Sequence, residues 1–199
     1  MTFLSPARVL VIGFATLIAA PAAHAGLLQN GGFETGNFTN WTQSGNVAIA
    51  TVPYFGIGNS TLDGRYLAIF NSGDSTPNAV LSQTFATIAG TDYTVSFDYG
   101  GTTGQSINVA STGFGGSALG SVFATSNGAF SSATVFSYTF EADSTSSTLT
   151  ISDSHANQTV SSDGILDNVS VTAVPEPTSL ALFGAGLAGL GWLRRRKMV

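Results

Sequence analysis

The chain has 199 residues, a formal net charge of −5 at pH 7, 9% charged residues and no cysteine. The absence of cysteine excludes disulfide bonds, thiolate metal sites and thiol catalysis. Residues 26–173 hold ten acidic residues and one basic residue, Arg65, a difference of −9, so this part would repel the phosphates of nucleic acid and favours cations.

The first 25 residues have the pattern of a secretory signal peptide. Arg8 precedes an apolar run from Val9 to Ala20, Pro21 ends the run, and Ala23-His24-Ala25 has the small residues of a cleavage site. An apolar run of about 12 residues is too short to span a membrane. We therefore expect signal peptidase to remove residues 1–25.

Residues 26–173 are enough for one domain with a hydrophobic core, and their pattern is all-β. In the clearest strand Tyr93, Val95 and Phe97 alternate with polar residues, as a half-buried antiparallel strand requires. The pattern predicts two sheets packed face to face in a β-sandwich. Strands are expected at Leu27–Gln29, Trp41–Gln43, Val47–Val52, Tyr66–Asn71, Ala79–Thr87, Asp92–Tyr99, Ile107–Ser111, Leu119–Ala124, Thr134–Ala142, Thr148–Ser152 and Ile165–Thr172.

Candidate catalytic groups are few. After loss of the signal peptide only His155 remains, so any Ser-His-Asp arrangement depends on it. Gly73-Asp74-Ser75 is similar to the nucleophile motif of a lipase and esterase family, but that family also uses Asp-x-x-His, where this chain has Asp153-Ser154-His155. Ten acids include no pair marked for glycoside hydrolysis. We expect no enzymatic activity.

The domain is expected to end at residue 173, because the prolines in Val174-Pro175-Glu176-Pro177 cannot continue a regular element. Beyond them, residues 179–193 would rise only about 22 Å as a helix, less than the roughly 30 Å hydrocarbon core of a bilayer. The basic residues from Arg194 to Lys197 would stay on the cytoplasmic side of a membrane. By these physical criteria the segment is a weak permanent anchor.

The order of parts in residues 174–199 resembles the PEP-CTERM sorting signal of Gram-negative, exopolysaccharide-producing bacteria. Its Pro-Glu-Pro motif is Pro175, Glu176 and Pro177, its short helix is rich in Gly, Leu and Ala, and its basic end contains Arg194, Arg195 and Arg196. The resemblance implies recognition by an exosortase, a membrane transpeptidase. It also implies transient insertion in the inner membrane, removal of the helix and sorting to the cell surface or the extracellular space.

The two ends of the domain resemble a second family, the jelly-roll, galactose-binding-like domains that include several carbohydrate-binding modules. The sequence NGGFETG at residues 30–36, followed by Trp41, is similar to the start of these domains. ILDNVSV at residues 165–171 is similar to their last strand. The resemblance implies a jelly-roll β-sandwich in which the first and last segments lie close together, with Phe33 and Trp41 in the core.

Many members of that family hold a structural calcium ion between these segments. Carried over onto this sequence, the resemblance implies ligands at Gly32, through its carbonyl, and at Glu34, Asp63 and Asp167. Calcium prefers six to eight oxygen ligands in irregular geometry, so the chemistry is suitable. The alternative is that Glu34 and Asp167 only accept backbone hydrogen bonds in turns.

A sugar-binding site would need exposed aromatic rings beside polar groups. Tyr54 and Phe55 follow Pro53 in a Gly/Asn-rich loop and are the best candidates for exposure. Two functions follow from these observations. The first is an exported, non-catalytic surface or matrix protein of an exopolysaccharide or biofilm layer. The second is a secreted carbohydrate-binding module with a specific glycan ligand.

Overall fold

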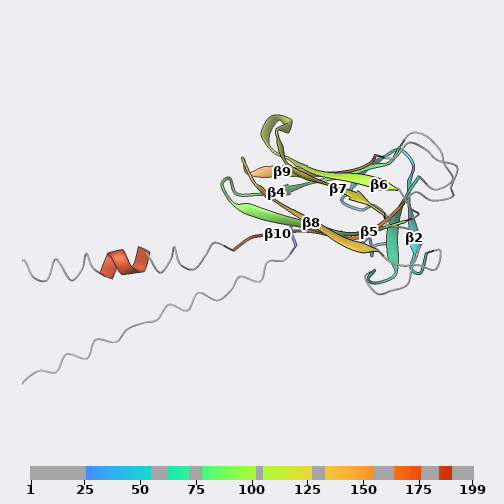
Figure 1. Ribbon diagram of the computed structural model, residues 1–199, viewed down its shortest axis with the longest axis horizontal. Helices are drawn as coiled ribbons and strands as arrows, with labels where there is room; N and C mark the ends of the chain where they lie inside the picture. Colours follow the sequence, from blue (N-terminus) through green and yellow to red (C-terminus); the bar gives the residue numbers. More distant parts are fainter. Residues whose placement is uncertain are drawn as a thin grey trace, which may run out of the picture.

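The computed structural model describes residues 26–54, 62–71, 78–101, 105–126, 133–154, 164–175 and 184–189. Within these ranges, ten strands form two antiparallel sheets packed face to face (Figure 1). The first sheet has the order β1-β4-β9-β6-β7 and the second the order β2-β3-β10-β5-β8. The strands are β1 Thr42–Ser44, β2 Val47–Thr51, β3 Tyr66–Phe70, β4 Val80–Ala86, β5 Asp92–Gly100, β6 Ser106–Thr112, β7 Ala118–Thr125, β8 Thr134–Glu141, β9 Ser146–Asp153 and β10 Gly164–Ala173. The predicted all-β, jelly-roll sandwich is confirmed.

One predicted strand, Leu27–Gln29, does not form. Leu27 N–H donates one ladder-like bond to Val171 O (3.0 Å), but Gln29 N–H donates to the side chain of Gln83 (2.7 Å). The Gln83 amide in turn donates to Gln29 O (2.9 Å). The side chain of Gln83 therefore takes the backbone hydrogen bonds of Gln29 that a partner strand would otherwise take. The alternation of apolar and polar residues does not predict such a contact.

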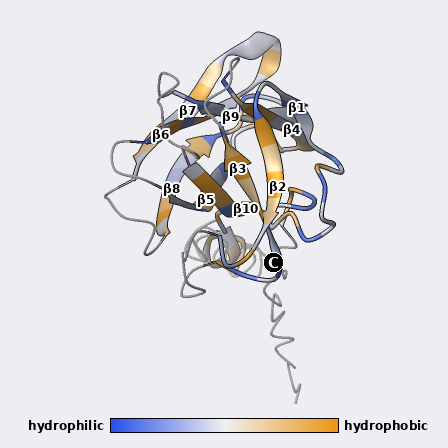
Figure 2. Ribbon diagram, turned by 90° about the vertical axis from the view of Figure 1, so that its right-hand side faces the viewer, coloured by the Kyte–Doolittle hydropathy of each residue, from blue (hydrophilic) through white to orange (hydrophobic). Residues whose placement is uncertain are grey.

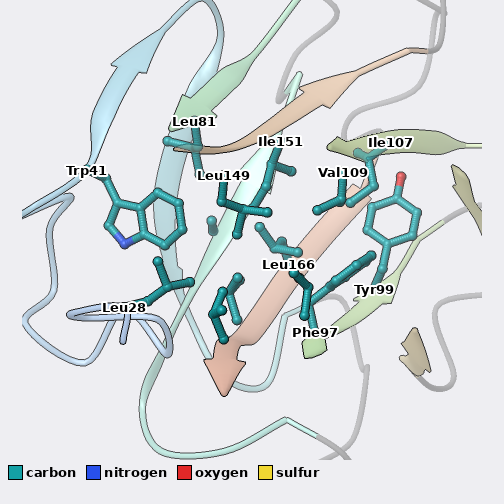
Figure 3. Packing of buried hydrophobic residues seen from close by; sticks show 14 of the residues in the cluster. Leu28, Trp41, Leu81, Phe97, Tyr99, Ile107, Val109, Leu149, Ile151 and Leu166 are labelled. Carbon is teal, nitrogen blue, oxygen red and sulfur yellow. The ribbon is translucent and has the colours of Figure 1, made fainter. Parts of the chain in front are cut away.

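The core lies between the two sheets and contains the residues that the strand alternation predicts. From the second sheet, Tyr93, Val95, Phe97 and Tyr99 of β5 are at most 3% exposed. They meet aliphatic side chains of the first sheet (Figure 3): Leu81, Ile107, Val109, Leu149 and Ile151. The rings of Phe97 and Phe136 stack at 5.7 Å. Burial of each such side chain stabilises the fold by about 1.5–3 kcal/mol.

A smaller apolar cluster covers part of the outer face of the second sheet. Figure 2 shows β2 and β3 as strongly apolar strands. Leu67 and Ile69 of β3 point away from the main core and pack against a second set of side chains. That set consists of Leu62, Ala133 and Ile165, with half-buried Ala50, Val52 and Tyr54. The outer face of the second sheet is thus closed at this end.

Residues 184–189 are helical and exposed. In the part of the chain that the structure describes, no helix is both long and apolar enough to cross a membrane. The predicted signal peptide, residues 1–25, and most of the sorting segment lie outside the described residues.

Candidate functional site

Two buried acidic residues face each other where β10 meets β5. Asp167 is directly opposite Asp98, and the two are 0% and 5% exposed. Regular pairing of β10 with β5 breaks between Asp167 and Ser170, where Asn168 has a φ of 51°. The loop at residues 30–36 lies on this bulge, because Val169 N–H donates to Gly31 O (3.0 Å). We call these two acids, together with the exposed Glu34 of this loop, the acidic site.

The structure brings together the four residues predicted to bind calcium. A β-carbon on Gly32 would lie 3.7 Å from Asp167 Oδ1 and 3.8 Å from Glu34 Cγ. Asp63 reaches the site through its backbone, since its N–H donates to Asp167 Oδ2 (3.3 Å). Asp98, which the sequence did not single out, joins them through Asn168, whose side-chain amide donates to Asp98 Oδ2 (2.9 Å).

In the described part of the chain, the groups whose charges act on Asp167 are two acids and no base. Burial raises the pKa of Asp167 to about 7, and the nearby charges of Glu34 and Asp98 act in the same direction. Backbone hydrogen bonds from Asn168 and Asp63 lower it in part. Burial also raises the pKa of Asp98, against the effect of its bond from Asn168. A cation would relieve this cost of burying carboxylates.

The donor set fits a calcium ion only in part. Asp167 supplies a buried carboxylate, and the absent side chain of Gly32 leaves room beside it. Glu34, however, already accepts N–H bonds from Arg65 and Tyr66 at 2.9–3.0 Å, and Asp63 Oδ1 accepts from Gly64 N–H (2.7 Å). Among the described residues, no three acidic or histidine side chains are grouped as a metal site. Backbone carbonyls would have to complete any shell.

The outer face of the first sheet is a second candidate site. Alternation in β4, β9 and β6 is regular, so every second residue faces outward. The registers align these residues into rows across the sheet, and we call them the hydroxyl face. It includes Thr42, Val80, Ser82, Thr84, Asn108, Ala110, Thr112, Ser121, Phe123, Thr125, Thr148, Thr150 and Ser152.

The hydroxyl face carries no charge. Asp153 is the only ionisable residue in the five strands of the first sheet, and its side chain is 7% exposed and accepts a bond from Asn71. Phe123 is 59% exposed and lies opposite Asn108, which in turn lies opposite Ser152. An exposed aromatic ring therefore stands beside an amide and several hydroxyl groups.

A pocket of about 440 Å³ lies next to the hydroxyl face, along the part of β4 that follows its pairing with β1. Its walls are Leu27, Gln29, Asn40, Gln83, Thr84, Phe85 and Ala86. No wall residue is charged, and Thr84 belongs to the hydroxyl face as well.

Of the two aromatic residues predicted to bind sugar, the structure describes only Tyr54. Tyr54 is half-buried against the cluster over the second sheet, and Phe55 is outside the described residues. Of the sorting motif, Pro175 is described, whereas Glu176, Pro177, Arg194, Arg195 and Arg196 are not. Alternation in β7 places Phe123 on the opposite face from Val122 and Ala124, and this much could be read from the sequence. Alternation alone does not say which of the two faces of the sheet is exposed to solvent.

Comparisons with known proteins address the sorting segment and the fold separately. The family profile of the PEP-CTERM protein-sorting motif matches residues 173–197. The chain therefore carries this motif, which marks an exported protein with a C-terminal membrane-anchor region. No curated protein matches the chain by sequence.

Among solved structures, the carbohydrate-binding module TmCBM61, in complex with β-1,4-galactotriose, is similar with a TM-score of 0.59 and 23% identity. The match covers 75% of this chain and 99% of that one. An arabinose-bound GH51 α-L-arabinofuranosidase, MgGH51, is similar with a TM-score of 0.53 and 15% identity over 75% of this chain and 26% of that one. The enzymatically active domain of the bacteriophage CBA120 tailspike protein 4 has a TM-score of 0.54 and 15% identity over 75% of this chain and 21% of that one. These similarities show the fold.

Proposed function

We propose that this protein is exported, processed by an exosortase, and acts without catalysis at the cell surface or in an exopolysaccharide layer, where its hydroxyl face binds a neutral polysaccharide. The sorting motif supports export and processing. The observation that carries the binding proposal is a charge-free outer face with one exposed aromatic ring in a domain of strongly acidic composition. In this proposal a Gram-negative cell releases the mature domain after signal peptidase and exosortase have acted.

The chemistry of the face favours neutral sugars. Hydroxyl and amide groups exchange hydrogen bonds with sugar hydroxyls, and the Phe123 ring offers an apolar surface on which a pyranose can stack. Thr84 and Thr148 already form a hydroxyl pair at 2.9 Å, so the side chains of neighbouring strands are held in place. The acids elsewhere in the domain would discourage binding of anionic polymers.

The alternative is a secreted carbohydrate-binding module with one specific glycan. The complex of TmCBM61 with β-1,4-galactotriose supports a galactan as the first ligand to test. The two proposals differ in breadth: a matrix component would be retained by the polysaccharide of its own cell, whereas a specific module would select one linkage among many.

Affinity electrophoresis on gels with β-1,4-galactan, other neutral polysaccharides and the host exopolysaccharide tests both. Phe123→Ala should weaken retention by about two- to tenfold, since stacking of a ring contributes about 0.5–1.5 kcal/mol beyond burial. Val135→Ala is the matched control, because Val135 is equally exposed, at 60%, but faces outward from the second sheet.

The outcomes separate the candidate surfaces. Loss of retention in Phe123→Ala alone supports the hydroxyl face. Loss only in Tyr54→Ala or Phe55→Ala would move the site to the loop predicted from the sequence. No retention of the parent protein on any polysaccharide would overturn glycan binding and leave a matrix role through self-association.

Structural calcium remains a proposal that the acidic site supports. Asp167 would hold the ion, with Gly32 O beside it, and Glu34 and Asp63 would join only if their present hydrogen bonds rearranged. Bound calcium would neutralise the buried carboxylate and join the first loop to the last strand.

A further inference from the structure

The end of the sandwich from which the sorting segment leaves has a surface of its own. Val174, the first residue after β10, donates its N–H to Asp92 O (2.8 Å). Asp92 follows the turn at residues 87–91, whose Gly90 N–H donates to Ala142 O (2.7 Å). Asp143 is next in the chain and binds the turn at residues 113–117. We call these two turns, with Asp143 and Val174, the sorting end.

Exposed apolar side chains gather at the sorting end. Ile88 is 69% exposed, Phe114 81% and Val174 38%. Outside the helical segment, the described residues include only two other large apolar side chains with comparable exposure, Phe123 and Val135. Figure 1 shows the turn that contains Phe114 at the same left-hand end as the departing C-terminal segment.

Phe114 and Ile88 lie on turns that hydrogen bonds hold in place. Asp143 accepts bonds from Phe114 N–H (3.0 Å) and Ser117 Oγ (2.5 Å), and Gly113 N–H donates to Ser117 O (2.8 Å). These hydrogen bonds lower the pKa of Asp143, so it stays ionised as the fixed acceptor of the turn. Ile88 N–H donates to Tyr93 Oη (2.9 Å). The apolar side chains thus face solvent in fixed positions with no packing role inside the domain.

The sequence limits how far this surface can be from a membrane that holds the tail. Six peptide steps separate Val174 from Leu180, where the apolar run begins, so the distance is at most about 22 Å. The headgroup layer accounts for about 5–8 Å of this span. Apolar and aromatic side chains partition into this interfacial layer.

We propose that the sorting end rests on the lipid surface while the tail is inserted, with Phe114 and Ile88 seated among the headgroups. This rests on the proposed export through a membrane intermediate. The contact holds the domain beside the membrane and places the Pro-Glu-Pro segment next to the bilayer.

Three acidic residues at this end are repelled by anionic lipid: Asp92, Glu141 and Asp143. The apolar contacts therefore act against a weak electrostatic repulsion, and the domain leaves the membrane once the tail is cut.

The absence of native cysteine allows single probes to be placed without background. The full chain is reconstituted in vesicles of phosphatidylethanolamine and phosphatidylglycerol, with an environment-sensitive fluorophore on Phe114→Cys, Ile88→Cys or Ser144→Cys. Val135→Cys is the control for exposure, because it lies on β8 near the opposite end, and Leu187→Cys reports insertion of the tail. A quencher attached to the lipid headgroup measures contact.

We expect quenching at positions 88 and 114 to exceed that at position 135 by at least about threefold, because interfacial side chains lie about 5–10 Å deep. Quenching at position 187 by an acyl-chain quencher, with none at positions 88 and 114 by the headgroup quencher, would overturn the proposal and leave tail insertion intact. No quenching at position 187 by lipids that carry the quencher in the acyl chain would instead refute the membrane intermediate. Replacing Ile88 and Phe114 together by serine should abolish quenching at position 144; unchanged quenching there would also overturn the proposal.

Discussion

Asp167 is the residue whose chemistry departs most from its surroundings, since its carboxyl is fully buried and the described groups whose charges act on it are two acids. Its pKa in the folded domain, about 7, is above the roughly 3.9 of an unfolded chain. The folded state therefore binds the proton more tightly. The free energy of unfolding of the metal-free domain should fall as the pH rises from 4 to 7, by roughly 2–4 kcal/mol from this group.

Urea unfolding in excess chelator between pH 4 and pH 7.5 measures this dependence. Asp167→Asn should flatten it, while Thr139→Asn, an exposed change on β8, should leave it as in the parent protein. Addition of calcium should restore stability above pH 6 and raise the melting temperature by several degrees. A melt that is identical in chelator and in calcium would contradict the calcium proposal, and a flat profile in the parent protein would contradict the raised pKa.

The acidic site also shows what residues alone can reveal. The positions of Gly32, Glu34, Asp63 and Asp167 followed from resemblance to motifs at the two ends of a known fold, and the structure brings them together. The part of Asp98 did not follow, because its burial depends on the bulge in β10 and on the loop above it. Those are long-range contacts that a pattern with period two does not contain.

At the scale of elements, the loop at residues 30–36 is fitted onto the bulge of β10, and Gly31 marks the closest approach. A β-carbon at Gly31 would fall 1.9 Å from Val169 O, a backbone atom, whereas one at Gly32 would meet only ordinary contacts of 3.6 Å or more. Gly31→Ala should therefore destabilise the domain by about 1–3 kcal/mol through overpacking. Gly32→Ala, the adjacent control, should change the metal-free stability little.

Chemical denaturation of the two variants in chelator provides the comparison. Equal stability of Gly31→Ala and the parent protein would mean that the loop does not rest on β10 in solution. A loss confined to Gly32→Ala, and seen only with calcium present, would instead point to the metal shell.

The strands themselves were readable from sequence because each is a short apolar alternation between turn residues. The predicted Asp92–Tyr99 and the observed β5, Asp92–Gly100, differ by one residue. The failure at Leu27–Gln29 came from Gln83, whose side chain replaces a strand partner. The sequence also did not show which outer strand faces are exposed to solvent. β3 is apolar throughout and its outer side is covered by neighbouring residues, whereas β9 alternates and its outer side is left in solvent.

At the scale of the whole molecule, the folded domain and its sorting segment meet at a narrow boundary. β10 pairs with β5 as far as Ala173, and Val174 adds one backbone bond to Asp92. We therefore expect the tail to contribute little to the stability of the domain, as its proposed removal by an exosortase requires. A chain of residues 26–175 should melt within about 2 °C of a chain of residues 26–199, because it keeps all of β10 and the bond from Val174 N–H to Asp92 O.

A chain that stops after Asn168 is the informative contrast. It loses Val169 and Val171, both at most 4% exposed, and the pairing of residues 170–173 with β5 in the centre of the second sheet. Cooperative melting should disappear, because a central strand is left half-paired and the core open. Calorimetry of both truncations gives the result. The boundary between the domain and the sorting segment would lie elsewhere in the chain if a cooperative transition were retained after loss of residues 169–175. The same would follow if the transition were lost on removal of residues 176–199 alone.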